Sequence, residues 1–211
     1  MKSTDYKIDR EKILDRDERS KLLKTCKDKA ELDLLHGRET WPRRYMLIDL
    51  ALFTGLRVSE IASLKIGDLN LKSKDSYLIV RNGKGGKKRD VYLDKVLTKH
   101  LKDFVSLKKK TLKESTDPDA PLFTGRNGGH CATITLMKSF KRAVEEAGLP
   151  KHYSIHCARH TYATYLLHDA KNMRYVQKQL GHSQMNMTAL YADVLPSENG
   201  NLANKIVRDA L

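Results

Sequence analysis

The sequence predicts a mainly helical domain that carries one small antiparallel β-sheet. Apolar residues recur at helical spacing through most of the chain, and loops marked by proline or glycine separate these segments. Residues 68–93 differ, because they contain the β-branched and aromatic segments "DLNL", "SYLIVRN" and "KRDVYL". The letters "GKGG" supply a turn between the last two of these. We therefore expect two or three antiparallel strands inserted among helices, an α+β fold.

The expected helices follow from their end signals. Asp15, with Glu18 three positions later, resembles a capping box and begins a helix that runs to about residue 36. An almost wholly apolar helix follows from Pro42 to Thr54, and Gly55 ends it. A short helix then starts at Arg57. Later helices are expected at residues 94–112, 131–147, 154–169, 172–180 and 184–194.

The chain divides into three parts. Residues 1–14 are polar and read as an arm or linker, residues 15–195 form the main domain, and residues 196–211 form a tail helix after Pro196. Leu202, Ile206 and Val207 give that tail an apolar stripe. A helix of about a dozen residues is marginal alone, so the stripe must dock. Docking on the chain's own body and docking on a second copy both stay open.

The composition excludes several classes of protein. A chain of 211 residues with 40% hydrophobic content can bury one core. It has no run of 18 apolar residues and no apolar segment typical of a signal peptide near its N-terminus, so we expect no membrane contact. Three cysteines without C-x-x-C spacing indicate reduced thiols. We expect a cytoplasmic protein.

Positive charge dominates the chain and is unevenly spread. The formal net charge is +14, and residues 65–113 hold fifteen Lys or Arg against five Asp or Glu. Such a stripe is the electrostatic footprint expected for a polyanion such as nucleic acid, although lysines that only keep a protein soluble give the same composition. Within it, "RNGKGGKKR" holds candidate DNA-contacting residues besides Lys84: Arg81, Lys87, Lys88 and Arg89.

One expected helix face gathers cationic groups. His156, Arg159 and His160 lie at positions i, i+3 and i+4, within a sector of roughly 100°. Like charges this close repel unless an anion lies between them. A zinc site is the alternative, but Cys157 occupies the place of the glutamate in an H-E-x-x-H pattern. We expect an anion here and neither a metal nor a cofactor.

Four segments together resemble a known family. In order and spacing, "TGLRVSEIASL", "GKGGKKR", "HCARHTYAT" and "LGHSQMNMTALY" resemble the signatures of the tyrosine recombinase (phage integrase) family, over roughly residues 45–193. The resemblance implies a catalytic domain that cuts and rejoins DNA through a 3′-phosphotyrosyl link. Members usually carry a further N-terminal DNA-binding domain, for which too few residues precede the Pro42 helix. We expect that domain to be absent from this chain.

The resemblance implies a role for each matching residue. Tyr191 is the nucleophile, Lys84 is the general acid for the leaving 5′-oxygen, and His156 assists proton transfer from the tyrosine. Three side chains bind the scissile phosphate, namely Arg57, Arg159 and His182. Two more have supporting roles, namely Glu60 and His160. The residue types suit the reaction, because guanidinium forks match phosphate geometry and a tyrosine with a pKa near 10 needs a base or a positive pocket.

The resemblance also implies partners. They are double-stranded DNA and further copies of the chain, with a monomer free in solution and a tetramer on synapsed DNA. The chain would then act at the nucleoid of a prokaryote or phage host, as part of a mobile element or of a chromosomal system. Two alternatives remain on the same fold, a DNA-binding regulator and a type IB topoisomerase-like enzyme that only relaxes supercoils.

Overall fold

The computed structural model describes residues 8–72, 74–81, 83, 86 and 88–192. Lys84, Lys87 and the expected tail helix at 196–211 lie outside these residues. None of the described helices is long and apolar enough to span a bilayer. The helices are α1 (Arg16–Leu35), α2 (Thr40–Thr54), α3 (Val58–Ser63), α4 (Lys95–Lys110), α5 (Thr133–Glu146), α6 (Ile155–Ala170), α7 (Met173–Leu180) and α8 (Asn186–Ala189), with short 3-10 turns at Arg10–Lys12 and Ile66–Asp68.

The strands form one small sheet. β1 (Leu69–Asn70), β2 (Tyr77–Val80) and β3 (Arg89–Tyr92) pair antiparallel in the order β1-β2-β3. Leu78 pairs with Val91, and both side chains are buried against the helices. The prediction of a mainly helical fold with two or three antiparallel strands inside residues 68–93 is confirmed.

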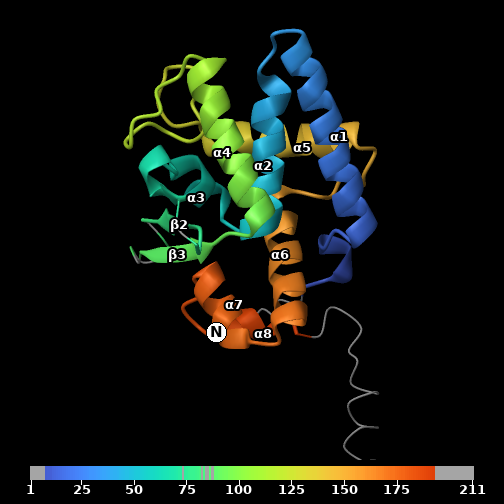
Figure 1. Cartoon of the computed structure of the whole chain (residues 1–211). Coiled ribbons are helices and arrows are strands. Elements are labelled where there is room, and N and C mark those ends of the chain that lie inside the picture. The colour runs from blue at the N-terminus through green and yellow to red at the C-terminus, as the bar shows by residue number, and fades with distance from the viewer. Residues whose placement is uncertain (1–7, 73, 82, 84–85, 87, 193–211) are drawn as a thin grey trace, which may run out of the picture.

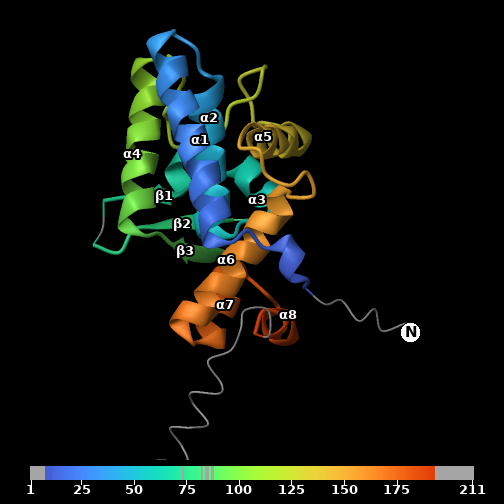
Figure 2. The ribbon, with the colours of Figure 1, turned by 90° about the vertical axis from the view of Figure 1, so that its right-hand side faces the viewer.

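The helix α2 is the centre of the fold. Figure 1 shows it between α1 and α4, and Figure 2 shows α5 and α3 on one side of it. It contacts α1, α4, α5 and α6, and every side chain from Met46 to Leu52 is buried. An almost wholly apolar helix can be covered on all sides in this way without leaving polar groups unsatisfied. The expected apolar helix that ends at Gly55 is thus present, and it lies at the centre of the fold.

The helix ends follow the sequence signals, with one exception. Asp15 accepts a hydrogen bond from the Glu18 N–H (2.8 Å), and Glu18 accepts one from the Asp15 N–H (2.9 Å), which is the predicted capping box. The helix expected at 184–194 is shorter, because α8 spans only Asn186–Ala189 and Tyr191 follows it in a turn. Asparagine and threonine are weak helix formers, so only one turn of helix forms there.

A second, smaller core lies around the later part of α6. It contains Ile8, Ile13, Ala163, Val176, Leu180 and Tyr191. Part of the expected polar arm is therefore packed, since Ile8 and Ile13 are buried here and the Leu14 N–H donates to Thr161 Oγ1 (3.0 Å). This cluster encloses Tyr191, whose exposed fraction is 5%.

Candidate active site

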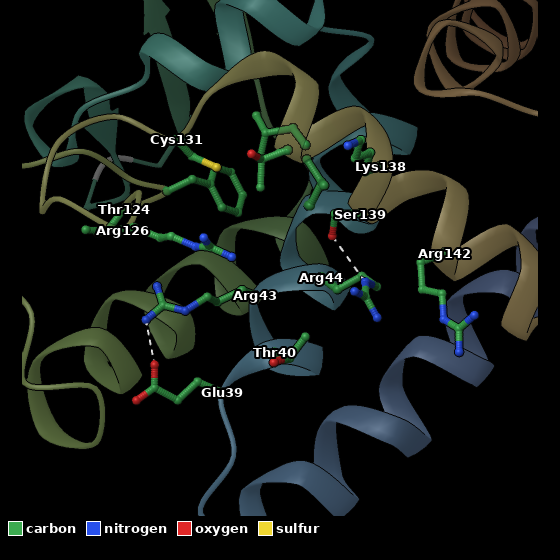
Figure 3. Close-up of a pocket in the computed structure, with 14 residues that line it drawn as sticks. Glu39, Thr40, Arg43, Arg44, Thr124, Arg126, Cys131, Lys138, Ser139 and Arg142 are labelled. Carbon is green, nitrogen blue, oxygen red and sulfur yellow. Dashed lines mark hydrogen bonds and ion pairs between the residues drawn. The ribbon is translucent and has the colours of Figure 1, made fainter.

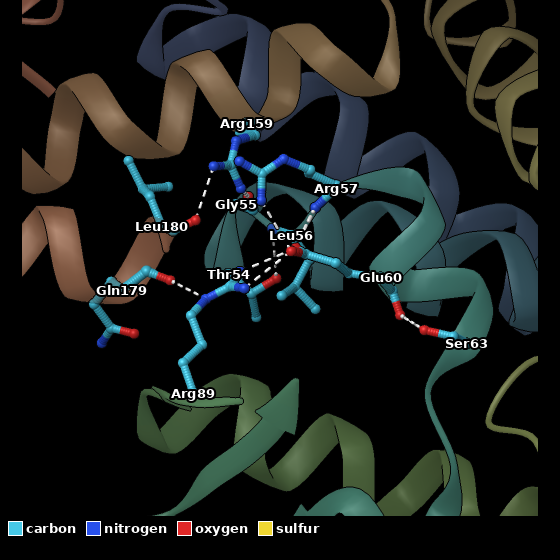
Figure 4. Close-up of polar contacts among 10 residues, drawn as sticks. All are labelled: Thr54, Gly55, Leu56, Arg57, Glu60, Ser63, Arg89, Arg159, Gln179 and Leu180. Atoms are coloured by element: carbon cyan, nitrogen blue, oxygen red, sulfur yellow. Dashed lines mark hydrogen bonds and ion pairs between the residues drawn. The ribbon is translucent and has the colours of Figure 1, made fainter. Parts of the chain in front are cut away.

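Two helices end on glycines beside the buried side chain of Arg159. Gly55 ends α2 with a φ of 61°, and Gly181 ends α7 with a φ of 65°, a region that favours glycine. Arg159 Nη1 donates to Gly55 O (2.6 Å), and Nη2 donates to Leu180 O (2.9 Å). The C-terminal ends of helices carry partial negative charge, which stabilises a cation. The two helix ends thus fix this guanidinium, as Figure 4 shows.

Glu60 holds the other two arginines of the site. Its buried carboxylate accepts from the Arg57 N–H (2.9 Å) and Arg57 Nη1 (3.0 Å), and from Nη1 and Nη2 of Arg89 (both 2.9 Å). Burial by itself raises the pKa of Glu60, but the hydrogen bonds and charge of Arg89, with the Arg57 N–H, outweigh it and lower the pKa below its usual value. Glu60 is therefore ionised, and it orients Arg57 at the start of α3.

Arg89 connects the sheet to α3 and α7. Its side chain is only 11% exposed, and besides the two bonds to Glu60 its Nε donates to Gln179 O (3.0 Å). A Cβ on Gly181 would lie 2.9 Å from Arg89 Cζ, so the glycine also makes room for this guanidinium. The sequence suggested Arg89 as a DNA contact, and in the structure its side chain lies inside the protein, because Glu60 supplies a buried carboxylate that binds it.

Positive charge exceeds negative charge at this point. Arg57, Arg89 and Arg159 carry three positive charges, and Glu60 supplies one negative charge. Burial, together with the charge of Arg57, lowers the pKa of Arg159 to about 10. Arg159 thus stays charged at neutral pH in surroundings that disfavour its charge. An anion next to Arg57 and Arg159 would relieve this cost, so the site is built for a negatively charged group.

The hydroxyl of Tyr191 contacts an imidazole. Tyr191 Oη lies 3.1 Å from Nδ1 of His160, and the Tyr191 ring stacks parallel to His182 at a centroid distance of 6.2 Å. Burial, then the charges of Arg159 and His156, lower the pKa of His160 to about 4. The imidazole is therefore neutral at pH 7, and an unprotonated Nδ1 can accept the phenolic proton.

His182 lies between this tyrosine and the arginines. Its Nδ1 is 3.0 Å from Oγ1 of the fully buried Thr188. Burial, followed by the charges of Arg159, Arg57 and Arg89, lowers the pKa of His182 to about 4. When Thr188 donates to Nδ1, Nε2 carries the proton and can donate to an anion. His182 is thus able to serve as a neutral donor.

His156 lies apart from the tyrosine. It is exposed at the start of α6 and makes no hydrogen bond within the described part of the chain. The three basic side chains of this helix therefore have different surroundings. Arg159 contacts the two helix ends, His160 contacts Tyr191, and His156 faces solvent. The resemblance implied that His156 assists proton transfer from the tyrosine, whereas the structure puts His160 in contact with Tyr191. Their shared helix face gave no signal that separates them.

The other basic candidates lie near the sheet. Arg81 is half exposed and forms an ion pair with the buried Asp68. Lys88 is exposed. Lys84 and Lys87 lie outside the described residues.

The site residues come from parts of the chain that are distant in sequence. The structure brings together Arg57, Glu60, Arg89, Arg159, His160, His182 and Tyr191. Of these, the internal role of Arg89 was missed, as were the contributions of Gln179 and Thr188. A nucleophile with a neighbouring base, beside fixed guanidiniums, is suited to attack on a phosphate ester.

The chain is similar to known proteins in its sequence and in its fold. The model of the phage integrase family matches residues 12–198. A tyrosine recombinase of Pseudothermotoga lettingae is 31% identical over 79% of this chain and 55% of its own length. Tyrosine recombinase XerD of Oceanobacillus iheyensis is 32% identical over 72% of this chain and 50% of its own. A XerH site-specific recombinase, solved in a pre-cleavage complex with its difH substrate, is 27% identical with a TM-score of 0.70 over 86% of this chain and 50% of that one.

The relatives and the family model match different shares of sequence. The chain spans about half the length of the curated relatives it matches. The family match, in contrast, covers the whole candidate site from Arg57 to Tyr191 and nearly all of the described fold. This chain belongs to the phage integrase family.

Proposed function

We propose that this chain cleaves and rejoins DNA strands as the catalytic part of a site-specific recombinase. One observation carries the proposal, namely that Tyr191 Oη is hydrogen bonded to the neutral imidazole of His160 beside an excess of guanidinium charge. A nucleophile, a base and a phosphate-binding group are what transesterification at phosphorus requires. The XerH relative, named with its difH substrate, supports DNA as the substrate.

The first step is capture of the scissile phosphate. Arg57 and Arg159 offer guanidiniums already fixed by Glu60 and by two helix ends, so little side-chain entropy is lost when the phosphate enters. His182 adds a neutral donor. During attack, negative charge grows on the non-bridging oxygens. These fixed donors therefore stabilise the transition state more than they stabilise the ground state.

The second step is covalent. Tyr191 Oη attacks phosphorus while His160 accepts the phenolic proton, a bond forms between Oη and phosphorus, and the bond from phosphorus to the 5′-oxygen breaks. The departing 5′-oxygen takes a proton, for which we retain Lys84 as the donor. Rejoining is the reverse, with a 5′-hydroxyl attacking the phosphotyrosine. The phosphodiester energy is conserved in the covalent link.

Assembly on DNA belongs to the same proposal. We infer that the chain is a monomer in solution, acts at the nucleoid, and forms a tetramer when two DNA sites are brought together, since recombination exchanges four strands. Light scattering with and without duplex measures this. A tetramer without DNA, or a chain that stays monomeric on its DNA while still exchanging strands, contradicts it.

Trapping the covalent intermediate tests the chemistry. The chain is incubated with a pool of nicked duplexes of randomised sequence, and a denaturing gel shows any adduct, which mass spectrometry assigns to a residue. We expect DNA on Tyr191, and no adduct with Tyr191→Phe. Tyr165→Phe, a matched change in the same apolar cluster, should keep the adduct. An adduct on another tyrosine would sink the assignment. On a supercoiled plasmid, relaxation without exchange of sites would favour the topoisomerase-like activity.

A bridging sulfur in the substrate tests Lys84. Sulfur leaves without a proton, so such a substrate should restore cleavage by Lys84→Ala. No rescue, with weaker DNA binding, would mean that Lys84 only contacts phosphate.

A further inference from the structure

A second basic site lies away from Tyr191. A pocket of about 620 Å³ opens between the start of α2, the helix α5 and residues 123–131. Figure 3 shows cationic side chains from all three segments around it. Its wall holds one carboxylate, that of Glu39, against five cations: Arg43, Arg44, Arg126, Lys138 and Arg142. The wall itself therefore has a surplus of positive charge.

Two of the five cations are neutralised. Arg43 Nη2 donates to Glu39 (2.8 Å) and to Glu114 (2.7 Å), and Arg142 pairs with Glu146 (2.6 Å). One nitrogen of Arg43, Nη1, is buried and has no hydrogen-bond partner among the described residues. A buried donor without an acceptor costs free energy, which an anion in the pocket would recover.

The other three cations have no carboxylate partner. Arg44 packs over the Trp41 ring at 4.3 Å and donates from Nε to Ser139 (3.1 Å), so it is held in place without a direct ion pair among the described residues. Burial and the charge of Arg142 lower the pKa of Arg44, and the opposing charges of Glu146 and Asp33 do not outweigh them. Arg126 and Lys138 are exposed, and neither forms an ion pair within the described part of the chain.

The pocket is connected to the active-site wall. His130, in the segment that borders the pocket, bonds through Nδ1 to Ala62 O of α3 (2.9 Å), and α3 carries Arg57 at its start. The helices α5 and α3 also lie on the same side of α2 in Figure 2. The segment that borders the pocket is therefore attached to the helix that starts at Arg57.

We propose that this pocket binds a backbone phosphate of the DNA duplex at a distance from the cleavage point. The inference rests on the proposed function, because the duplex is the substrate of that site. Guanidinium groups match phosphate oxygens in pairs, and an open pocket with an exposed lysine at its edge accepts a backbone without reading bases. The contact fixes where the duplex lies relative to Tyr191.

The test compares salt dependence between two double variants. Arg126→Ala/Lys138→Ala removes two exposed, unpaired cations from the pocket, so folding should be unaffected. Each lost phosphate contact reduces the slope of log Kd against log salt by about 0.9, so loss of this one contact should lower the slope by about 0.9. Lys24→Ala/Lys27→Ala removes the same charge from the exposed face of α1 and should leave the slope unchanged.

Mapping on DNA decides between sources of the phosphate. Ethylation of single phosphates should reveal at least one position that weakens wild-type binding but not binding by the pocket variant. Pyrophosphate is the second probe. If it binds the pocket tightly while the salt slopes of both double variants match the wild type, the site is for a small anion and the proposal is overturned. Adduct formation by the wild-type chain reports separately on the proposed function, so each idea can fail alone.

Discussion

The two basic regions of this molecule differ in how many of their cations are held in place, since only the pocket also carries cations without a fixed partner. At the candidate active site, Arg57, Arg89 and Arg159 are each bound to Glu60 or to helix ends. In the pocket beside α5, Arg126 and Lys138 extend from exposed positions without an ion pair in the described residues. The first arrangement fixes guanidiniums before a ligand arrives. The second leaves solvated charges that order only on contact.

The difference separates catalysis from binding in energetic terms. Donors fixed in a water-poor site need no reorganisation when charge develops in a transition state, so each affects the rate strongly. Exposed cations are hydrated and screened by salt, and they contribute chiefly by releasing counterions from DNA. Substitutions at the two regions should therefore change different measurements, namely the cleavage rate at saturating DNA and the salt dependence of binding.

Arg159→Ala should have the largest effect. Loss of one fixed donor of this kind costs about 10²–10³-fold in rate, and Ala also leaves Gly55 O and Leu180 O without their donor. Single-turnover cleavage at saturating DNA measures the rate, and thermal unfolding measures the structural cost. Arg159→Lys keeps the positive charge but loses the paired N–H donors of the guanidinium, so this variant should also cleave slowly. A rate within threefold of wild type for both variants would contradict the assignment.

Arg89→Gln should have the next largest effect, although Arg89 acts through Glu60. Loss of its two bonds to Glu60 loosens the support of Arg57, and small misplacements of catalytic groups cost up to about 10²-fold. We expect the saturated cleavage rate to fall about tenfold to 100-fold, with the affinity for DNA nearly unchanged. Arg81→Gln is the matched control, because Arg81 pairs with the buried Asp68 from a half-exposed position. Equal losses in both variants would indicate a general effect on the sheet.

The fold could be predicted from local signals. Asp15 and Glu18 cap α1, Gly55 ends α2 in the left-handed region, and the segments around β2 and β3 alternate as strands do. The burial of Ile8 and Ile13 could not be predicted, because these two side chains find their apolar partners on α6 and α7, more than a hundred positions later. Local patterns do not report contacts of that kind.

The site could be predicted only in part. Family-like segments pointed to Arg57, Arg159, His182 and Tyr191, and the structure brings these together. The capture of Arg89 by Glu60, 29 positions away, leaves no local trace in a run of basic residues. The choice between His156 and His160 depends on where the short α8 places Tyr191, which no helical periodicity encodes.

Protonation of the active-site histidines should give a third, smaller effect, which is a loss of stability as the pH falls. The pKa values of His160 and His182 are lowered to about 4 in the folded chain, below the usual value near 6.5. Between these values the unfolded chain binds more protons than the folded one, so stability is complete above pH 6.5 and falls as the pH drops towards 4.

Two measurements check this effect. Thermal unfolding should show a slope in this pH window that His182→Gln reduces. NMR of the imidazoles should show both pKa values rising when duplex DNA is added, since phosphate favours the charged form. Titration of both rings near 6.5 in the free protein would contradict the expectation.

Glu39→Gln should have the smallest effect, and it should strengthen binding. The substitution removes the one carboxylate of the pocket wall, while Arg43 stays paired with Glu114 (2.7 Å). Exposed charge interactions of this kind are worth up to about 1 kcal/mol, so DNA affinity at low salt should rise by about twofold to threefold. Glu31→Gln on α1, which makes the same charge change at an exposed i,i+4 pair, is the control. If both variants gain equally, total charge and not the pocket is responsible. If Glu39→Gln weakens binding, the pocket needs this carboxylate to position Arg43, and the two basic regions are then less different than their contacts indicate.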